Sequence, residues 1–451
     1  MDRNNKTHPQ TMRNLTAILM LAVVLLASCQ ADSLMQTIFP EETEESSVIP
    51  QASLSPTEEV DEESNSTPTV QTIESTRRTL RVWVPPQFSP LEDLPAATLF
   101  TERLQEFENL NPQIQIEVRV KASTGKGNLL ETLTSASIVA PETVPALIAF
   151  SRSDIEVAIS RGLIFPIGNY SAEADSSDWY EYAREIAQYK NVAYGLPFAG
   201  DALVILSDKN QPFQDATTWD ALRRQARKIA FPADDPQAWL GFALYQSTKG
   251  KLQDQQGQIS LQEDALLQLL EEIRLNVLRN VFINETSNFQ TYDQIWQNYL
   301  NGQWPAVVTW SSNYLQSPIE YNIYPLPAIE GDYFTLARGW VWCLADNDPE
   351  IAEIAMQLAE FLIEKEYLAQ WSQSIGYLPV RPSSLTAWQN REDFITISGI
   401  LNSAHNRPDT EIVNQIGPIL REAIKAILLQ EKTPEAAVES ALDQIEALKA
   451  N

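Results

Sequence analysis

The chain has 451 residues, which is too long for one compact core and fits two domains of ordinary size with terminal segments. Its formal net charge of −28 argues against a nucleic-acid surface, which needs a clustered basic patch, and disfavours polyanionic ligands. Two histidines and two cysteines cannot build a His/Cys metal centre, so we expect neither metal nor cofactor.

The N-terminus has the pattern of a sorting signal. Basic residues precede an apolar run over 15–27, which has the length of a signal-peptide core and is short of the roughly 20 residues that span a membrane. The run ends in Leu26-Ala27-Ser28-Cys29, which resembles the bacterial lipobox. That resemblance implies a signal peptide over 1–28 and lipidation of Cys29. An ordinary secretory signal with an incidental cysteine is the alternative.

Acidic residues are frequent over 30–76, among Ser, Thr and Pro, and no Lys or Arg occurs there. Such a segment buries too little apolar surface to offset its ordering entropy, and its charges repel one another. We therefore expect 29–78 to be the lipidated cysteine followed by a disordered tether. It would hold a folded body at the outer face of the cell membrane, with membrane contact through the lipid alone.

The folded body begins with a strand at Thr79–Val84, a helix over 94–110 and a second strand at Ile114–Val120. This β-α-β unit favours an α/β layered domain. Periodicity predicts further elements in order: helices over 128–138 and 155–162, a strand over 146–150, helices over 219–229, 261–278 and 292–300, strands over 305–310, 321–326 and 339–345, and helices over 349–363, 366–374, 413–430 and 434–448.

The stretch Val192–Asn210 interrupts this pattern. It predicts a turn at Gly195-Leu196-Pro197, a crossing of small residues at Ala199-Gly200 and an apolar strand over 202–206, with Asp201 at its head. We interpret it as a hinge between two lobes.

The order of motifs resembles the extracellular solute-binding proteins of bacterial ABC importers, in the carbohydrate-type family that includes the maltose-binding protein. The resemblance covers about 79–451 and depends on shared landmarks: Trp83 in the first strand, Asn111-Pro112, Ala158-Ile159-Ser160-Arg161-Gly162-Leu163-Ile164, Tyr194-Gly195-Leu196-Pro197 with Asp201, Trp304-Pro305-Ala306-Val307-Val308, Tyr324-Pro325-Leu326-Pro327 and Gly376-Tyr377-Leu378-Pro379.

The resemblance implies an α/β fold of the periplasmic-binding-protein type II, with two lobes and three crossings. Crossings at Gly195–Asp201, near Gly339 and at Gly376–Pro379 give one lobe of 79–199 plus 340–377 and another of 200–339 plus 378–451. A monomer would close by a hinge motion around a sugar or other small solute and deliver it to a permease.

Two residues are the first candidates for ligand contact. Asp201 matches an acidic sugar contact of the family, and a carboxylate can accept hydrogen bonds from sugar hydroxyls. A turn-capping role is its alternative. Trp310 matches a stacking tryptophan, and the alternative for it is a place in the core.

A second group of candidates includes Phe150, Arg152 and Asp154, which come at the end of a strand where open α/β sheets bind ligands. Arg152 and Asp154 could instead pair with each other at the surface. Four further aromatic candidates have a core role as the alternative: Phe88, Trp239, Trp340 and Tyr377.

Other functions find less support. No Gly-x-Ser-x-Gly, Walker loop or His-Glu-x-x-His motif is present, and no spacing marks an acid/base pair of carboxylates, so we do not expect an enzyme. Cys343 lies in an apolar run and is expected in the core. A surface-anchored sensor without a permease, or a binder of a non-sugar solute, stays open.

Overall fold

The computed structural model describes residues 77–449. The predicted signal peptide, Cys29 and most of the acidic tether lie outside the described residues. Within 77–449, no helix combines the length and apolar character needed to cross a membrane.

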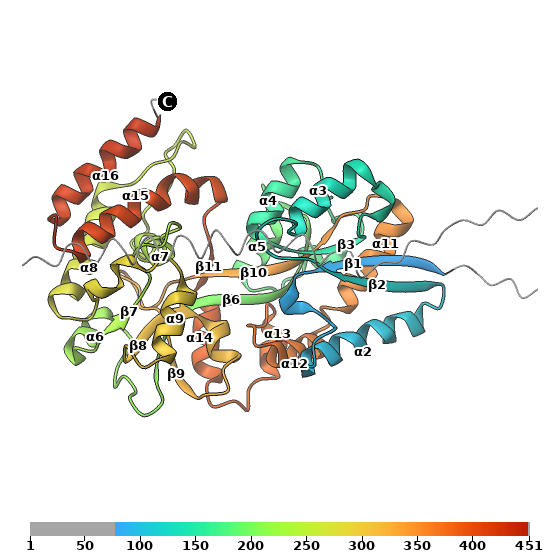
Figure 1. The fold of residues 1–451 in the computed structure, drawn as a ribbon, viewed down its shortest axis with the longest axis horizontal. Helices are drawn as coiled ribbons and strands as arrows, with labels where there is room; N and C mark the ends of the chain where they lie inside the picture. Colours follow the sequence, from blue (N-terminus) through green and yellow to red (C-terminus); the bar gives the residue numbers. More distant parts are fainter. Residues whose placement is uncertain (1–76, 450–451) are drawn as a thin grey trace, which may run out of the picture. The chain divides into compact units, whose positions relative to one another are not determined.

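The described chain is an α/β body (Figure 1). Its strands are β1 (Arg78–Val84), β2 (Ile114–Val120), β3 (Leu147–Ser151), β4 (Gln188–Tyr189), β5 (Val192–Ala193), β6 (Gly195–Asp208), β7 (Ile229–Ala230), β8 (Ala306–Trp310), β9 (Tyr321–Pro325), β10 (Thr335–Leu344) and β11 (Ala404–Asn406).

The α-helices are α2 (Pro95–Leu110), α3 (Leu129–Val139), α4 (Arg152–Ser160), α5 (Glu181–Ala187), α6 (Trp219–Gln225), α7 (Trp239–Ser247), α8 (Glu263–Leu278), α9 (Tyr292–Leu300), α10 (Ser311–Leu315), α11 (Pro349–Phe361), α12 (Lys365–Ile375), α13 (Pro382–Thr386), α14 (Phe394–Asn402), α15 (Thr410–Leu428) and α16 (Pro434–Lys449).

One mixed sheet organises the body, with the strand order β2-β1-β3-β10-β6-β8-β7; β9 also pairs with β6, and β11 with β10. β1 is parallel to both β2 and β3, which confirms the predicted β-α-β unit. The two longest strands, β6 and β10, are antiparallel neighbours in the middle of the sheet (Figure 1). They connect β3 on one side with β8 on the other.

β6 differs from the predicted turn, crossing and short strand, because it is one continuous strand from Gly195 to Asp208. Pro197 has no N–H to donate to the neighbouring strand. It is tolerated because Val341 faces it, and the pairing register of β6 and β10 shifts between Trp340 and Val341. Gly195 is also required by close approach: a Cβ there would lie 2.3 Å from the backbone oxygen of Trp342.

The apolar core forms two clusters, which β6 separates. Successive side chains of a strand point to opposite faces. Ala202 and Val204 accordingly belong to the first cluster, and Leu203 and Ile205 to the second. The second cluster also contains buried side chains of α7, α8, α15 and α16, four helices that contact one another.

Most predicted helices are present, with shifted ends. The predicted 155–162 helix is wrong at its start, because Ser151 and Asp154 form a capping box that begins α4 at Arg152. The predicted 219–229 helix is too long, because Ala226 adopts a left-handed conformation with φ of 49° that ends α6. The short elements α5, α14 and β11 had no predicted counterpart.

Candidate functional site

The three segments predicted as crossings meet at one residue, Gly200. Gly339 faces Gly200 in the register of β6 and β10. On the other side, Gly200 donates its N–H to the Leu378 carbonyl at 2.9 Å and accepts the Leu378 N–H at 2.8 Å. Glycine is needed at this position because a Cβ would lie 2.1 Å from the Tyr182 hydroxyl. These contacts place the three segments side by side.

At this junction, the side of β10 that carries Arg338 and Trp340 is accessible to solvent, and we call it the open face of β10. Arg338 and Trp340 are two positions apart and therefore point to the same side of the strand. Ala337, which precedes Arg338, and Gly339, which lies between the two, are buried. The Arg338 side chain is 50% exposed and Trp340 is partly exposed. The facing β6 residue opposite Trp340 is the small Ala199, which leaves the indole without a large neighbour on that strand.

Asp201 lies opposite Arg338 and is only 1% exposed. Its Oδ1 accepts hydrogen bonds from the Ser311 hydroxyl at 2.8 Å and the Ser312 N–H at 2.9 Å. Its Oδ2 accepts from the Ser312 hydroxyl at 2.9 Å and from Arg338 Nε and Nη2 at 3.1 and 2.9 Å. The carboxylate thus caps the first turn of α10 and holds the guanidinium, as a buried charge requires.

Trp310, at the end of β8, lies beneath Arg338. The guanidinium carbon is 4.0 Å from the centroid of the indole, a cation–π contact, and the Tyr292 ring meets the indole edge-on at 5.7 Å. With these neighbours Trp310 is only 5% exposed. Its predicted stacking face is occupied in this structure by a side chain of the protein itself.

Trp239 begins α7 and is also buried. Its backbone N–H donates to Asp235 Oδ2 at 3.1 Å, and its indole N–H donates to Gln237 Oε1 at 3.1 Å. Burial raises the pKa of Asp235 to about 6, although the backbone hydrogen bonds from Trp239 and Gln237 favour its charged form. This corner therefore holds a carboxyl group that titrates in the mildly acidic range.

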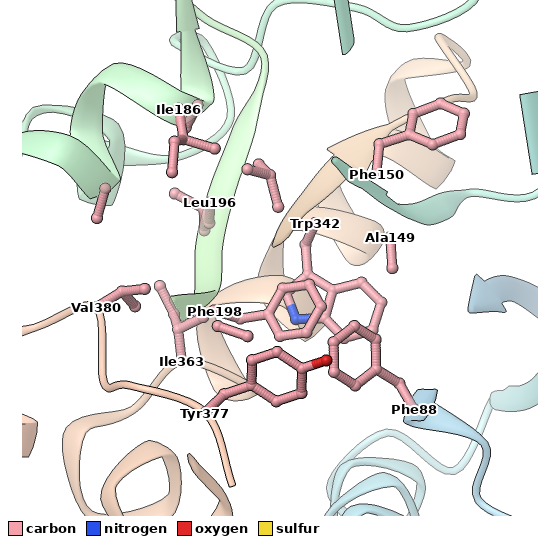
Figure 2. Packing of buried hydrophobic residues seen from close by; sticks show 14 of the residues in the cluster. Phe88, Ala149, Phe150, Ile186, Leu196, Phe198, Trp342, Ile363, Tyr377 and Val380 are labelled. Atoms are coloured by element: carbon pink, nitrogen blue, oxygen red, sulfur yellow. The ribbon is translucent and has the colours of Figure 1, made fainter. Parts of the chain in front are cut away.

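Phe88 and Tyr377 form an aromatic cluster behind Trp340. The Phe88 ring is 5.4 Å from Trp340 and 5.6 Å from Tyr377, and it also contacts Phe198 at 5.1 Å. Figure 2 shows Phe88, Phe198 and Tyr377 gathered around Trp342. Burial raises the pKa of Tyr377 to about 12. Both predicted residues are buried; Phe88 packs directly against the Trp340 ring, and Tyr377 packs against Phe88.

The predicted group Phe150, Arg152 and Asp154, at the end of β3, is engaged in contacts within the protein. Phe150 is 0% exposed, and its ring lies apart from Phe88 and Tyr377 (Figure 2). Arg152 does not pair with Asp154 as suggested; it pairs with Glu156 at 2.8 Å and with Asp409 at 3.0 Å. Asp154 accepts the Ser151 hydroxyl at 2.7 Å in the cap of α4, and burial raises its pKa. In this conformation all three have structural partners.

Sequence reasoning missed Arg338, although a signal for it was present. Arg338 is the only charged residue in the strand sequence TLARGWVWCL, just as Asp201 is the only charged residue before the end of GLPFAGDALVILSD. Two opposite charges in two apolar strands predict a pair, because an unpaired buried charge is costly. The antiparallel register of β6 and β10 was needed to recognise it.

Other places in the described chain do not resemble this junction. A pocket of about 660 Å³ lies against β9 and the start of α14 and contains none of the predicted contact residues. Over 77–449, no three His, Cys, Asp or Glu side chains gather as metal ligands would. Cys343 is fully buried, and burial raises the pKa of its thiol well above the ordinary value, which agrees with a core position.

Comparison with known proteins agrees with this architecture. A curated maltotriose-binding protein from Pyrococcus abyssi is 22% identical over 373 residues, which are 77% of this chain and 74% of that protein. Two solved structures are similar in fold: the cyclic α-maltosyl-1,6-maltose binding protein from Arthrobacter globiformis has a TM-score of 0.68 at 14% identity, and the maltose-bound periplasmic protein MalE from Listeria monocytogenes has 0.66 at 15%. Each alignment covers 82% of this chain, with 98% and 97% of the respective other chain.

The family model described as bacterial extracellular solute-binding protein matches residues 102–395. That range includes the three crossings, Asp201, Trp310 and the open face of β10. The match and the fold confirm the resemblance drawn from the motifs. The chain belongs to the bacterial extracellular solute-binding protein family.

Proposed function

We propose that this protein captures a mono- or oligosaccharide on the open face of β10 and delivers it to an ABC transporter permease, without chemical turnover. The observation that carries the proposal is the pair Arg338 and Trp340, which point to the same side of β10 where three crossings meet. This junction lies between the proposed lobes, where hinge closure would enclose a ligand.

The two side chains supply the two kinds of contact that sugars need. An indole ring packs on the apolar C–H face of a pyranose, and Trp340 is partly exposed and supported by Phe88. A guanidinium donates hydrogen bonds to hydroxyl oxygens, and Arg338 is half exposed. The curated relative and the two similar structures are named for maltotriose, a cyclic maltosyl sugar and maltose, which supports a glucan ligand.

The lobe boundaries are part of the proposal. One lobe would consist of 79–199 plus 340–377 and the other of 200–339 plus 378–451. In support, every residue of the second core cluster, from Leu203 to Ile445, lies in the second of these lobes. The first cluster extends across the crossings, so closure would pivot on a shared central sheet.

The test of carbohydrate binding is thermal unfolding of the full chain with a sugar panel that includes maltose and maltotriose. A ligand that binds only the folded form stabilises it by mass action, so we expect at least one sugar to raise the melting temperature in a concentration-dependent way. No shift with any sugar, together with a shift from polyamines or metal ions, would overturn the assignment.

We further propose that Cys29 is lipidated and anchors the protein at the outer face of the cell membrane. The lipobox at 26–29 supports this. Cys29→Ala should abolish incorporation of radiolabelled palmitate, with Cys343→Ala as the matched control that leaves labelling intact. Unchanged labelling of the Cys29 variant would contradict lipidation.

A further inference from the structure

We propose that Arg338 is a ligand-contacting residue that determines which sugar is bound, and that Asp201 and Trp310 are positioning residues that act through it. The inference rests on the proposed carbohydrate function and deepens it. It reverses the expectation from the sequence, in which the acid and the tryptophan themselves touch the ligand.

Arg338 is held in one orientation by Asp201 and Trp310. Nε and Nη2 both donate to Asp201 Oδ2, at 3.1 and 2.9 Å, and the guanidinium lies 4.0 Å above the Trp310 ring. A hydrogen-bonded edge and a stacked face together fix the plane of the group. An arginine fixed in this way loses little further freedom when a ligand arrives, so each hydrogen bond to the ligand costs less entropy.

The Arg338 guanidinium has N–H donors that Asp201 does not engage and that a ligand can use. It has five N–H donors, and the two hydrogen bonds to Asp201 engage two of them, which leaves three. The side chain is half exposed, on the same side of β10 as Trp340. A sugar that packs on the Trp340 ring would therefore extend along the side of β10 that also carries these donors.

Asp201 and Trp310 have almost no exposed surface for a ligand to contact. The two carboxylate oxygens already accept five hydrogen bonds, from Ser311, Ser312 and Arg338. One indole face is covered by the guanidinium. A ligand that displaced Arg338 to reach either residue would leave a buried carboxylate without its counter-ion, which costs more than ring stacking returns.

The charge around Arg338 affects the choice of ligand. Asp201 neutralises the charge of Arg338 locally, and the chain as a whole carries a net charge of −28. An anionic ligand therefore gains little from this guanidinium and is repelled by the rest of the protein. The fixed donors favour a neutral sugar with correctly placed hydroxyl oxygens over one that lacks them.

The experiment is a double-mutant cycle on the full chain, with maltotriose as the probe and the panel sugar that gives the largest melting shift as a second probe. Arg338→Ala should weaken binding about 10- to 100-fold, because hydrogen bonds to charged groups are among the stronger ones. Asp201→Asn and Trp310→Phe should each weaken it less. In the Arg338→Ala background, neither should weaken it further, because their effect passes through the missing guanidinium. Arg119→Ala, at a partly exposed arginine of β2 that pairs with Glu117, is the matched control and should leave sugar affinity unchanged.

Three results would overturn the inference. If Arg338→Ala binds as tightly as the wild type while the wild type binds sugar, Arg338 does not contact the ligand, and the proposed function survives. If Asp201→Asn weakens binding equally with and without Arg338, Asp201 touches the ligand directly. If the wild type binds no sugar of the panel, the proposed function fails and this inference fails with it. Melting curves of each variant separate loss of binding from loss of folding, and the Asp201→Asn/Arg338→Ala pair removes both charges together.

Discussion

Two regions of the molecule place an arginine beside a carboxylate near an aromatic residue, and they differ in what the arginine has left to donate. At the start of α4, Arg152 is 7% exposed and donates to Glu156, to Asp409 and to backbone carbonyls at the end of α5. On β10, Arg338 is 50% exposed, and among residues 77–449 Asp201 is its one hydrogen-bond acceptor. The residue types are the same, so the unused donors distinguish a binding group from a structural one.

The enclosed region joins three helices. Arg152 Nη1 donates to the Glu185 carbonyl at 2.9 Å, in the last turn of α5. Glu156 accepts the Thr410 N–H at 2.8 Å, in the first turn of α15. A cation at a helix C-terminus and an anion at a helix N-terminus are both favourable. This network therefore stabilises the fold, and we expect it to have no direct part in binding.

The largest expected effect is on stability, at Glu156. This carboxylate is 9% exposed and pairs with both Arg152 and Arg407. Glu156→Gln removes the carboxylate that pairs with the buried Arg407 guanidinium, while Arg152 keeps Asp409, and it should lower the free energy of unfolding by about 3 to 5 kcal/mol, measured by urea denaturation. Glu117→Gln, at the partly exposed pair with Arg119, is the matched control and should cost less than about 1 kcal/mol. A change in maltotriose affinity of the folded Glu156 variant would break the contrast between the two regions.

The next effect is a pH dependence at Asp235. Its folded pKa of about 6 lies above the ordinary value, so the folded state holds this proton more tightly than the unfolded state. Its ionisation therefore costs stability as pH rises from 4 to 6, by up to about 3 kcal/mol. Asp235→Asn does not titrate. The free energy of unfolding of the wild type minus that of the variant should therefore fall over that range. A flat difference between pH 4 and pH 7 would contradict the burial argument.

A smaller effect is expected at Trp340, and it should appear in binding rather than in folding. Trp340→Ala removes a partly exposed ring and should weaken sugar binding about tenfold or more, close to 1–2 kcal/mol. Trp340→Phe keeps an aromatic face and should restore part of the affinity. Isothermal titration calorimetry measures both variants. If both variants lost sugar affinity equally, or if the alanine variant alone failed to fold, the Trp340 ring would have a structural role in the core.

The smallest effect is expected at Asp154. Its side chain completes the capping box of α4, and loss of such a cap costs about 1 kcal/mol. Asp154→Ala should lower stability by that amount in urea denaturation and leave sugar affinity unchanged. Weaker binding at unchanged stability would instead return Asp154 to the ligand site.

The sequence predicted much of the fold because its signals are local. Alternating strands and the amphipathic helices could be placed within a few residues, and α9 matches its predicted range of 292–300. Shared motifs indicated the family, which the comparison confirms, and the three predicted crossings. β6 was misjudged because Gly195 and Pro197 favour turns in isolation, and only pairing with β10 makes them part of a strand.

The site was harder to predict because its geometry depends on distant contacts. Asp201 was found, but Ser311 and Ser312, which bury it, lie about 110 residues away in the sequence. Trp310 was found, but the guanidinium that covers it comes from another strand. Phe150 and Arg152 had the composition of a site, and their burial follows from the packing of α4 against β3 and β10.

The most direct test of the open face of β10 is a crystal structure of the protein with the panel sugar that binds best. We expect a sugar ring against the Trp340 indole, with hydroxyl oxygens within hydrogen-bond distance of the Arg338 guanidinium and Asp201 still buried beneath it. A sugar bound at Phe150, Arg152 and Asp154, or in the pocket beside β9, would contradict binding on the open face of β10.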